Sequence, residues 1–122
     1  MHYKRIELKV TNQGIHERKI FQGVKIFSRS KLSKDQKSIL TQKLYLTPKQ
    51  NIVYYQRTDV NYDQNWQHNK DYYELAYDQL DREIVFKVCQ DFDELSPFLE
   101  NELLEKLKEK QSAGKFFEKL DI

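Results

Sequence analysis

Cysteine, glycine and long apolar runs are all scarce in this chain of 122 residues. The single cysteine, Cys89, excludes an internal disulfide and any Cys-x-x-Cys site for zinc or thiol redox chemistry. The three glycines, Gly14, Gly23 and Gly114, lie far apart, so no glycine-rich phosphate-binding loop is present. No apolar run approaches the ~20 residues that cross a bilayer, and residues 1–5 are not followed by the apolar region of a signal peptide. We therefore expect a cytoplasmic protein that makes no membrane contact.

Motifs for catalysis and for metal binding are also missing. The histidines His2, His16 and His68 lie too far apart to have the spacing of metal ligands. The acidic residues within 91–94 could form a metal site, but we favour a helix start, because a helix N-terminus attracts negative charge. No serine or cysteine has the pattern of a nucleophile elbow. We expect no enzyme activity, no metal and no cofactor, and the sequence indicates no particular chemistry.

Aromatic and charged residues are abundant instead, at 13% and 33% of the chain. The aromatic content argues against disorder, because disordered chains lack the side chains that build a core. Charge is distributed unevenly: residues 1–60 carry 13 Lys and Arg against 4 Asp and Glu, whereas residues 61–122 carry 8 against 15. Either the two halves attract each other when they pack, which we favour, or a basic surface is left for an anionic partner.

Residues 3–90 contain strand-like segments in which apolar and polar side chains alternate, the period of a half-buried strand. Six segments have this pattern or a strand-like composition: 6–10, 19–27, 40–46, 52–60, 71–77 and 84–88. The segment 71–77 is also compatible with a helix. Turn residues at 12–14 and 47–51 keep the connections short, and short connections join antiparallel strands. Gly23 indicates either a bulge or a close approach of two backbones.

A helix is expected after the strands. Ser96 followed by Pro97 predicts its start, because Ser caps free N–H groups and Pro suits the first helical position. An apolar stripe at helical spacing consists of Leu99, Leu103, Leu104 and Leu107. Gly114 is a typical helix stop, and the apolar tail after it should dock back on the body. Cys89, beside the last strand, is expected to be a small buried thiol rather than a reactive one.

Together these patterns predict an α+β fold in one domain over residues 1–122. Its sheet is an antiparallel β-meander of five to six strands, curved or barrel-like, over residues 3–90. A C-terminal helical region at 91–113 and a docked apolar tail at 114–122 pack against that sheet.

The end of the chain resembles a known family. Its signature residues spell E-x-L-D-I and are Glu118, Leu120, Asp121 and Ile122. A strand pair like 43–47 with 51–55, and the sequence at 92–95 before an acidic helix, are similar to the layout of the EXLDI family. The resemblance covers about residues 20–122. It implies no settled activity, since the family has none. Some longer relatives carry an N-terminal segment resembling a ribbon-helix-helix element, whereas residues 1–11 here are one alternating stretch.

The signature tail has three interpretations. It can be a structural clasp in which Phe117, Leu120 and Ile122 fill a groove and Asp121 meets a basic residue. It can be a peptide presented to a partner that captures C-termini. It can also cover a ligand site and move. We favour the clasp, because the density of apolar residues favours burial.

Basic and aromatic residues interleave on the predicted strands and form a candidate binding face. That face is Lys25, Phe27, Arg29, Lys43, Tyr45, Tyr55 and Arg57, with Lys19, Phe21 and Tyr54 nearby. Such residues on a sheet can stack bases and hold phosphates. Aromatic strands are also how any β-core is built, and we weight the core above nucleic acid.

Three functional hypotheses follow. The first is a non-catalytic binding or regulatory module with a protein partner, or with a second copy through an exposed sheet edge. The second is a nucleic-acid binder that uses the basic strands. The third and weakest is a carrier in which the sheet cups a small apolar ligand.

Overall fold

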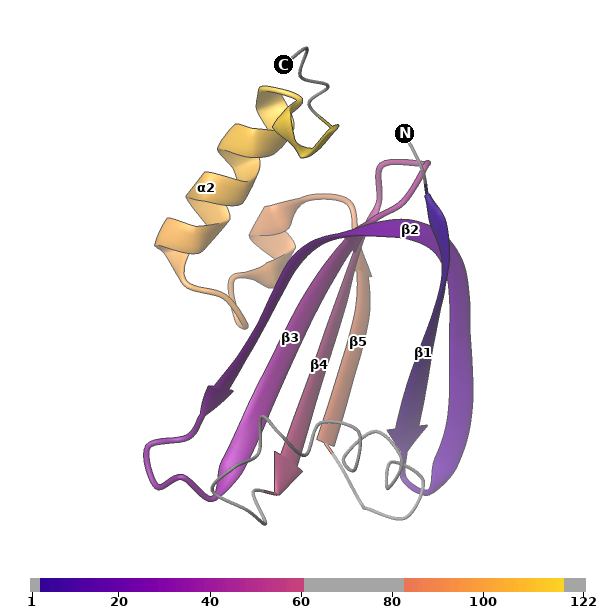
Figure 1. The fold of residues 1–122 in the computed structure, drawn as a ribbon, viewed down its shortest axis with the longest axis vertical. Helices are drawn as coiled ribbons and strands as arrows, with labels where there is room; N and C mark the ends of the chain where they lie inside the picture. Colours follow the sequence, from indigo (N-terminus) through magenta and orange to yellow (C-terminus); the bar gives the residue numbers. More distant parts are fainter. Residues whose placement is uncertain (1–2, 61–82, 118–122) are drawn as a thin grey trace, which may run out of the picture.

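The computed structural model describes residues 3–60 and 83–117, which form one antiparallel sheet with helical segments packed on it (Figure 1). The strands are β1 (Lys4–Asn12), β2 (Ile15–Leu32), β3 (Ser38–Leu46), β4 (Ile52–Val60) and β5 (Glu83–Cys89). The helical segments are the 3-10 helix η3 (Phe92–Leu95), the α-helix α2 (Asn101–Ser112) and the 3-10 helix η4 (Lys115–Phe117). The strands pair in chain order from β1 to β5, which confirms the predicted meander. The predicted strand at 71–77 lies outside the described residues.

Two tight turns fix the register of the sheet. Gln13 and Gly14 have φ values of 51° and 78° and close the β1–β2 hairpin as a two-residue turn between the paired Asn12 and Ile15. Left-handed conformations at both positions are what a type I′ two-residue hairpin turn requires, and glycine adopts one without strain. The β3–β4 turn over 47–51 is confirmed, although Gln50 rather than Asn51 takes the left-handed conformation, at φ 66°.

Strand β2 is 18 residues long, which is longer than the predicted 19–27. It pairs with two neighbouring strands. Its first half pairs with β1 and its second half with β3, and a bulge interrupts the second pairing between Lys25 and Phe27. A Cβ added at Gly23 would lie 2.9 Å from the Phe21 ring and 3.3 Å from the Leu46 backbone oxygen. This glycine therefore marks a close approach to a neighbouring backbone, and the bulge lies elsewhere. A bulge bends its strand, and β2 arches across the sheet (Figure 1).

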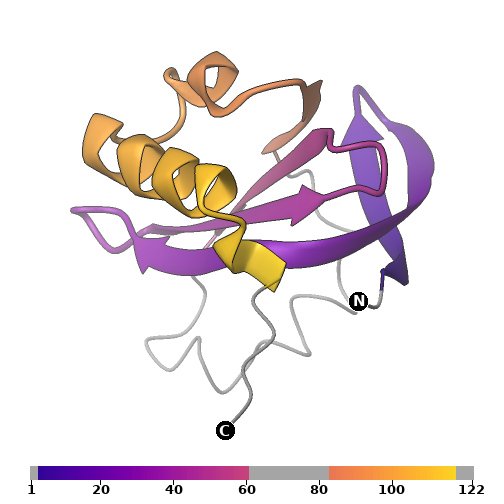
Figure 2. The same cartoon turned by 90° about the horizontal axis from the view of Figure 1, so that it is seen from above.

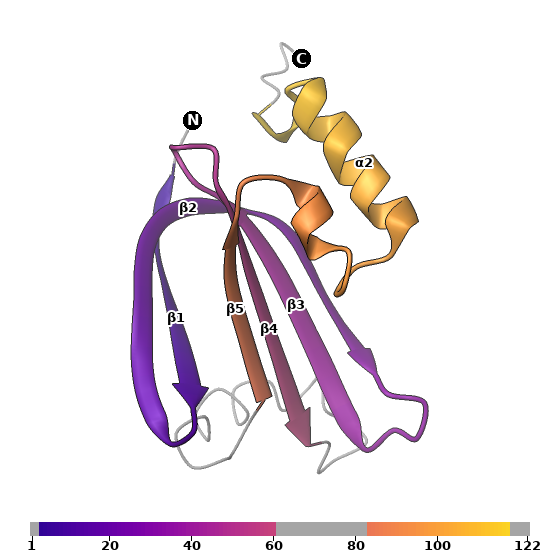
Figure 3. The ribbon, with the colours of Figure 1, turned by 180° about the vertical axis from the view of Figure 1, so that it is seen from behind.

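The sheet curls into a half-barrel with an apolar core on each face. The helical segments lie together at one side of the sheet (Figure 2). The core beneath them contains Leu44, Leu46, Ile52, Tyr54, Cys89, Phe92, Leu95, Leu99, Leu104 and Leu107. The core on the concave face contains Leu8, Val10, Tyr45, Val53 and Tyr55. Strand β1 lies next to β5 (Figure 3), and no strand pairing joins these two edges within the described residues.

The predicted helix start at Ser96–Pro97 is wrong. Asp91 caps the N-terminus of η3 and forms a reciprocal capping box with Glu94, so the acidic residues begin a 3-10 helix. Ser96 falls at the C-terminal end of η3, where its N–H donates to the Asp93 carbonyl. The α-helix begins only at Asn101.

The later part of the prediction agrees with the structure at the helix stop and in part of the apolar stripe, since Leu99 lies before α2. The predicted tail at 114–122 is described only as far as Phe117. Leu104 and Leu107 are on the buried face of α2. The helix ends before Gly114, which has a φ of 67°. After this glycine, the Phe116 ring packs 6.4 Å from the Phe92 ring, centroid to centroid. Cys89 is buried, as expected. The signature residues at 118–122 lie outside the described residues.

Candidate functional site: a groove along the edge of strand β2

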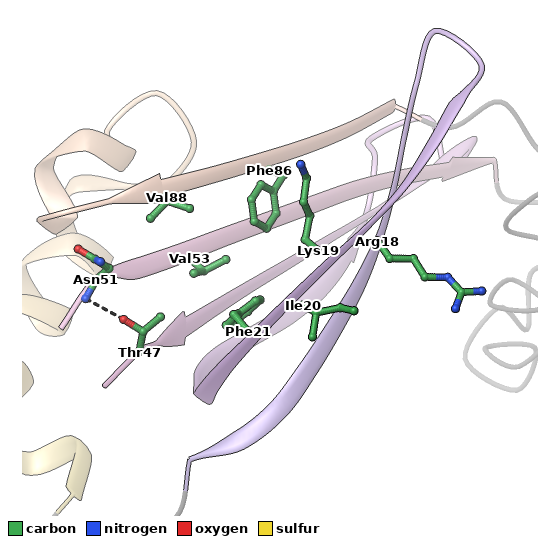
Figure 4. Close-up of a pocket in the computed structure, with 9 residues that line it drawn as sticks. All are labelled: Arg18, Lys19, Ile20, Phe21, Thr47, Asn51, Val53, Phe86 and Val88. Carbon is green, nitrogen blue, oxygen red and sulfur yellow. Dashed lines mark hydrogen bonds between the residues drawn. The ribbon is translucent and has the colours of Figure 1, made fainter. Parts of the chain in front are cut away.

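An open groove of about 360 Å³ lies between β2 and the β4–β5 part of the concave face (Figure 4). The residues that line it are Arg18, Lys19, Ile20, Phe21, Thr47, Asn51, Val53, Phe86 and Val88. Five of these nine are apolar, two are cationic and none is acidic. Ile20 and Val88 are 54% and 56% exposed, so the groove includes apolar surface that is open to solvent. The groove therefore combines an apolar surface with positive charge at its rim.

The lining residues show how the groove is oriented. Strand β2 contributes four consecutive residues, Arg18 to Phe21, whose side chains alternate between its two faces. Strand β5 contributes only alternate residues, Phe86 and Val88, which share a face with Val53 of β4. A groove that touches both faces of one strand runs along the edge of that strand. The wall is thus the edge of β2, and the floor is the face of β4 and β5.

Backbone groups along this edge have no strand partner among residues 3–60 and 83–117. In a two-residue hairpin the closing pair is hydrogen-bonded in both directions, and bonded and non-bonded pairs then alternate. The closing pair here is Asn12 with Ile15, so the pairs containing Arg18 and Ile20 are non-bonded. The N–H and C=O groups of these two residues consequently point away from β1. No strand described in the structure pairs with them on that side.

The two cations at the rim are held loosely by neighbours on the same hairpin. Arg18 Nη1 lies 3.3 Å from Glu7 Oε1, and Lys19 Nζ lies 2.7 Å from Glu17 Oε2. Both pairs are exposed to solvent, where an ion pair contributes little to stability. Lys19 Nζ also lies 5.6 Å from the centroid of the Phe86 ring, so its charge sits above the groove floor.

The structure divides the predicted basic and aromatic face between the two sides of the sheet. Five members share the concave face by register: Lys25, Lys43, Tyr45, Tyr55 and Arg57. Phe27 and Arg29 turn to the helix-covered face, because the bulge after Lys25 reverses the alternation of the strand.

Most aromatic members of that predicted face serve the core. Tyr45 and Tyr55 are 5% and 3% exposed, and the Tyr55 hydroxyl donates to the Lys9 carbonyl at 3.4 Å. Arg57 is buried and its Nε donates to Asp59 Oδ2 at 2.9 Å. Of the nearby residues, Lys19 and Phe21 line the groove, whereas Tyr54 is fully buried beneath the helical segments.

A polar network beneath the helical segments was not anticipated from the sequence. Gln42 accepts a hydrogen bond from Arg29 Nε at 2.6 Å and donates to the Tyr54 hydroxyl at 3.0 Å and to the Phe98 carbonyl at 3.1 Å. The Arg29 guanidinium also donates two bonds to Glu100, at 2.9 and 2.8 Å, which lowers the pKa of that carboxyl to about 2. Burial raises the pKa of Tyr54. The network ties the sheet to the segment before α2.

This network explains part of the charge asymmetry. Glu100, from the acidic half, is bound by Arg29 and lies 3.8 Å from Lys31, and both cations belong to the basic half. It also explains why α2 lacks a side-chain cap, because the residue at the N-cap position is Glu100 itself and its carboxylate is engaged by Arg29. The attraction between the halves is therefore concentrated at one carboxylate among the described residues.

Other candidate chemistries find little support in the part of the chain that is described. No group of three His, Cys, Asp or Glu residues there could hold a metal ion. Burial raises the pKa of the Cys89 thiol, which disfavours the reactive thiolate. Within residues 3–60 and 83–117, no helix has the length and apolar character needed to cross a membrane.

Comparison with known proteins gave no relative of this chain. No protein-family model, no curated protein and no solved structure matches it.

Proposed function

We propose that this chain is a non-catalytic binding module, and that it holds a segment of a partner protein in the groove along β2. The observation that carries this proposal is the coincidence of an exposed apolar floor with an open strand edge, at Val88 and Ile20. A strand edge offers hydrogen bonds to another chain, and the apolar floor supplies binding energy through burial. The module acts in the cytoplasm, where proteins without disulfides are usual.

The chemistry of the groove favours binding over catalysis. General acid-base catalysis needs a group that changes protonation near neutral pH, usually His or a carboxyl group with a shifted pKa. The nine lining residues include no histidine, cysteine or acidic residue. The two charged residues in the groove, Arg18 and Lys19, are cations suited to holding negative charge.

Partner capture tests the proposal with a matched pair of variants. Val88→Asp places a charge on the groove floor, whereas Val60→Asp places the same charge at an equally exposed valine outside the groove, 53% against 56% exposed. A photo-crosslinker at Ile20 should join the partner in the wild-type chain and in the Val60 variant but not in the Val88 variant. Equal crosslinking in both variants would show that the groove is not the binding site.

A small apolar ligand with an anionic group is the second candidate. The groove volume of about 360 Å³ lies within the range of ligand pockets, roughly 300–1,000 Å³. Titration with a medium-chain carboxylate, followed by the amide resonances of Phe86 and Val88, tests it. The nucleic-acid hypothesis has less support, because Tyr45 and Tyr55 are buried and are not available for stacking on bases.

We also propose that the chain is an EXLDI protein whose tail docks as a clasp. Phe116, which contacts the core beneath the helical segments, supports a chain that returns to the body after Gly114. Removing residues 118–122 should then lower the melting temperature, and an unchanged melting temperature would favour a tail presented to a partner.

A further inference from the structure

We propose that the partner segment binds as an additional β-strand along the open edge of β2. We further propose that this segment places two acidic residues beside Arg18 and Lys19 and two apolar residues beside Ile20 and Phe21. This inference rests on the proposed function and adds the mode of binding and the chemistry of the partner. Strand addition is a common way for one protein to bind an extended segment of another.

The backbone of β2 supports this mode. Arg18 and Ile20 lie two residues apart, and each directs an N–H and a C=O away from β1, as deduced from the hairpin register. An added strand would pair with these groups at the usual spacing of about 4.8 Å. The backbone groups of β2 therefore offer directional hydrogen bonds to a bound segment, which a purely apolar groove would lack.

The side chains of β2 make the two ends of the site chemically different. The residues at one end of the edge, Arg18 and Lys19, are cationic on both faces of the strand, and those at the other end, Ile20 and Phe21, are apolar on both faces. Neighbouring strands are stabilised by pairs of opposite charge and by pairs of apolar side chains. The matching segment is therefore charged at one end and apolar at the other, rather than alternating.

The groove floor also favours apolar residues at one end of the partner segment. Val53 and Val88 lie on the concave face beside the β2 edge (Figure 4). Val88 is 56% exposed, and an apolar side chain above it would remove that surface from water. An antiparallel segment meets Phe21 first and Arg18 last, so its sequence would be two apolar residues followed by two acidic ones.

A blocked synthetic peptide with the core Ile-Val-Glu-Glu tests the inference by NMR titration of the full ¹⁵N-labelled chain. We expect shifts at Arg18 to Gln22 and at Val88, together with slower exchange of the Ile20 amide hydrogen. Replacing Glu-Glu with Lys-Lys should weaken binding several-fold, because it sets like charges against Arg18 and Lys19. Val88→Asp should abolish the shifts, and Val60→Asp should leave them unchanged.

Two N-methylated peptides test the strand geometry. In an added strand only alternate amides face β2, so methylation of one set should block binding while methylation of the other set should not. If neither methylation matters but Val88→Asp still abolishes crosslinking of the partner, strand addition is wrong and the proposed function stands. If the Lys-Lys peptide binds as well as the Glu-Glu peptide, or if the wild-type chain binds neither up to millimolar concentration, the stated partner chemistry is wrong. Self-association that the peptide cannot displace would assign the groove to a second copy and would also overturn the inference.

Discussion

Replacing Gln42 with leucine should destabilise the protein strongly, although the substitution leaves no cavity. Gln42 is 1% exposed and makes three hydrogen bonds, to Arg29 Nε, the Tyr54 hydroxyl and the Phe98 carbonyl. Leucine has a similar volume but can replace none of these bonds. The Arg29 Nε–H and the Phe98 carbonyl would each lose the bond to Gln42, whereas Tyr54 still donates to Gln56. The cost arises from polar groups left unsatisfied in a buried place.

The magnitude follows from the number and kind of bonds. A typical buried hydrogen bond contributes about 1 kcal/mol, and one to a charged group about 1.5–3 kcal/mol. Arg29 keeps its two bonds to Glu100 and remains partly exposed, so water can reach part of the guanidinium. We therefore expect Gln42→Leu to lower the free energy of unfolding by about 2–4 kcal/mol.

Urea unfolding measures this loss, and Glu100→Gln provides the matched control. Glu100 belongs to the same network but its side chain is 54% exposed. Exposed ion pairs contribute about 0–1 kcal/mol, so the control should lose far less stability than Gln42→Leu. Near-wild-type stability of the Gln42 variant, or a larger loss in the Glu100 variant, would show that the buried part of the network does not stabilise the fold.

Three further outcomes are expected. The hydrogen bonds from Arg29 lower the pKa of Glu100 from 4.5 to about 2, so its contribution is complete above pH 4.5 and is lost as the pH falls toward about 2. The stability difference between the wild-type chain and Glu100→Gln should close over this interval in acid titrations, and a constant difference would contradict the assignment. Gly23→Ala should cost about 1–3 kcal/mol in urea unfolding, because its Cβ would meet the Phe21 ring at 2.9 Å, and an unchanged midpoint would refute the close approach. Cys89 should resist a thiol reagent in the native state and react fully in urea, since it is 1% exposed and burial raises its pKa, whereas rapid native labelling would be inconsistent with this burial.

The parts of the fold that depend on neighbouring residues could be predicted from the sequence. Strand β4 was predicted with its observed bounds, Ile52–Val60, because its alternation and the turn before it are local. Burial of Leu44 and Leu46 on one face of β3 and of Tyr45 on the other follows from the same period of two. The turn at 12–14 was predicted from its turn residues, and the structure closes it at Gln13 and Gly14.

The remaining features depend on contacts between distant residues. Phe27 and Arg29 were expected beside Lys25, but the bulge places them on the opposite face, and nothing in the local alternation marks its position. The helix start at Ser96 was wrong because Ser96 ends the 3-10 helix that Asp91 begins. The α-helix begins only after Glu100, whose carboxylate is bound by the distant Arg29. The groove itself requires the bend of β2, which brings residues 18–21 over β5.

The bulge in β2 affects the bend of this strand but not the residues with which it pairs in β3. Lys25 pairs with Tyr45 and Phe27 with Leu44, so Ile26 has no partner of its own in β3. A chain lacking Ile26 would keep every pair on both sides, because Phe27 would follow Lys25 directly into its present position. A deletion elsewhere in the paired strand would shift a whole set of partners. Ile26 is thus the one place in the β2–β3 ladder where chain length can change without a change of partners. Its deletion would remove the local bend and the packing of Ile26 against the core beneath the helical segments.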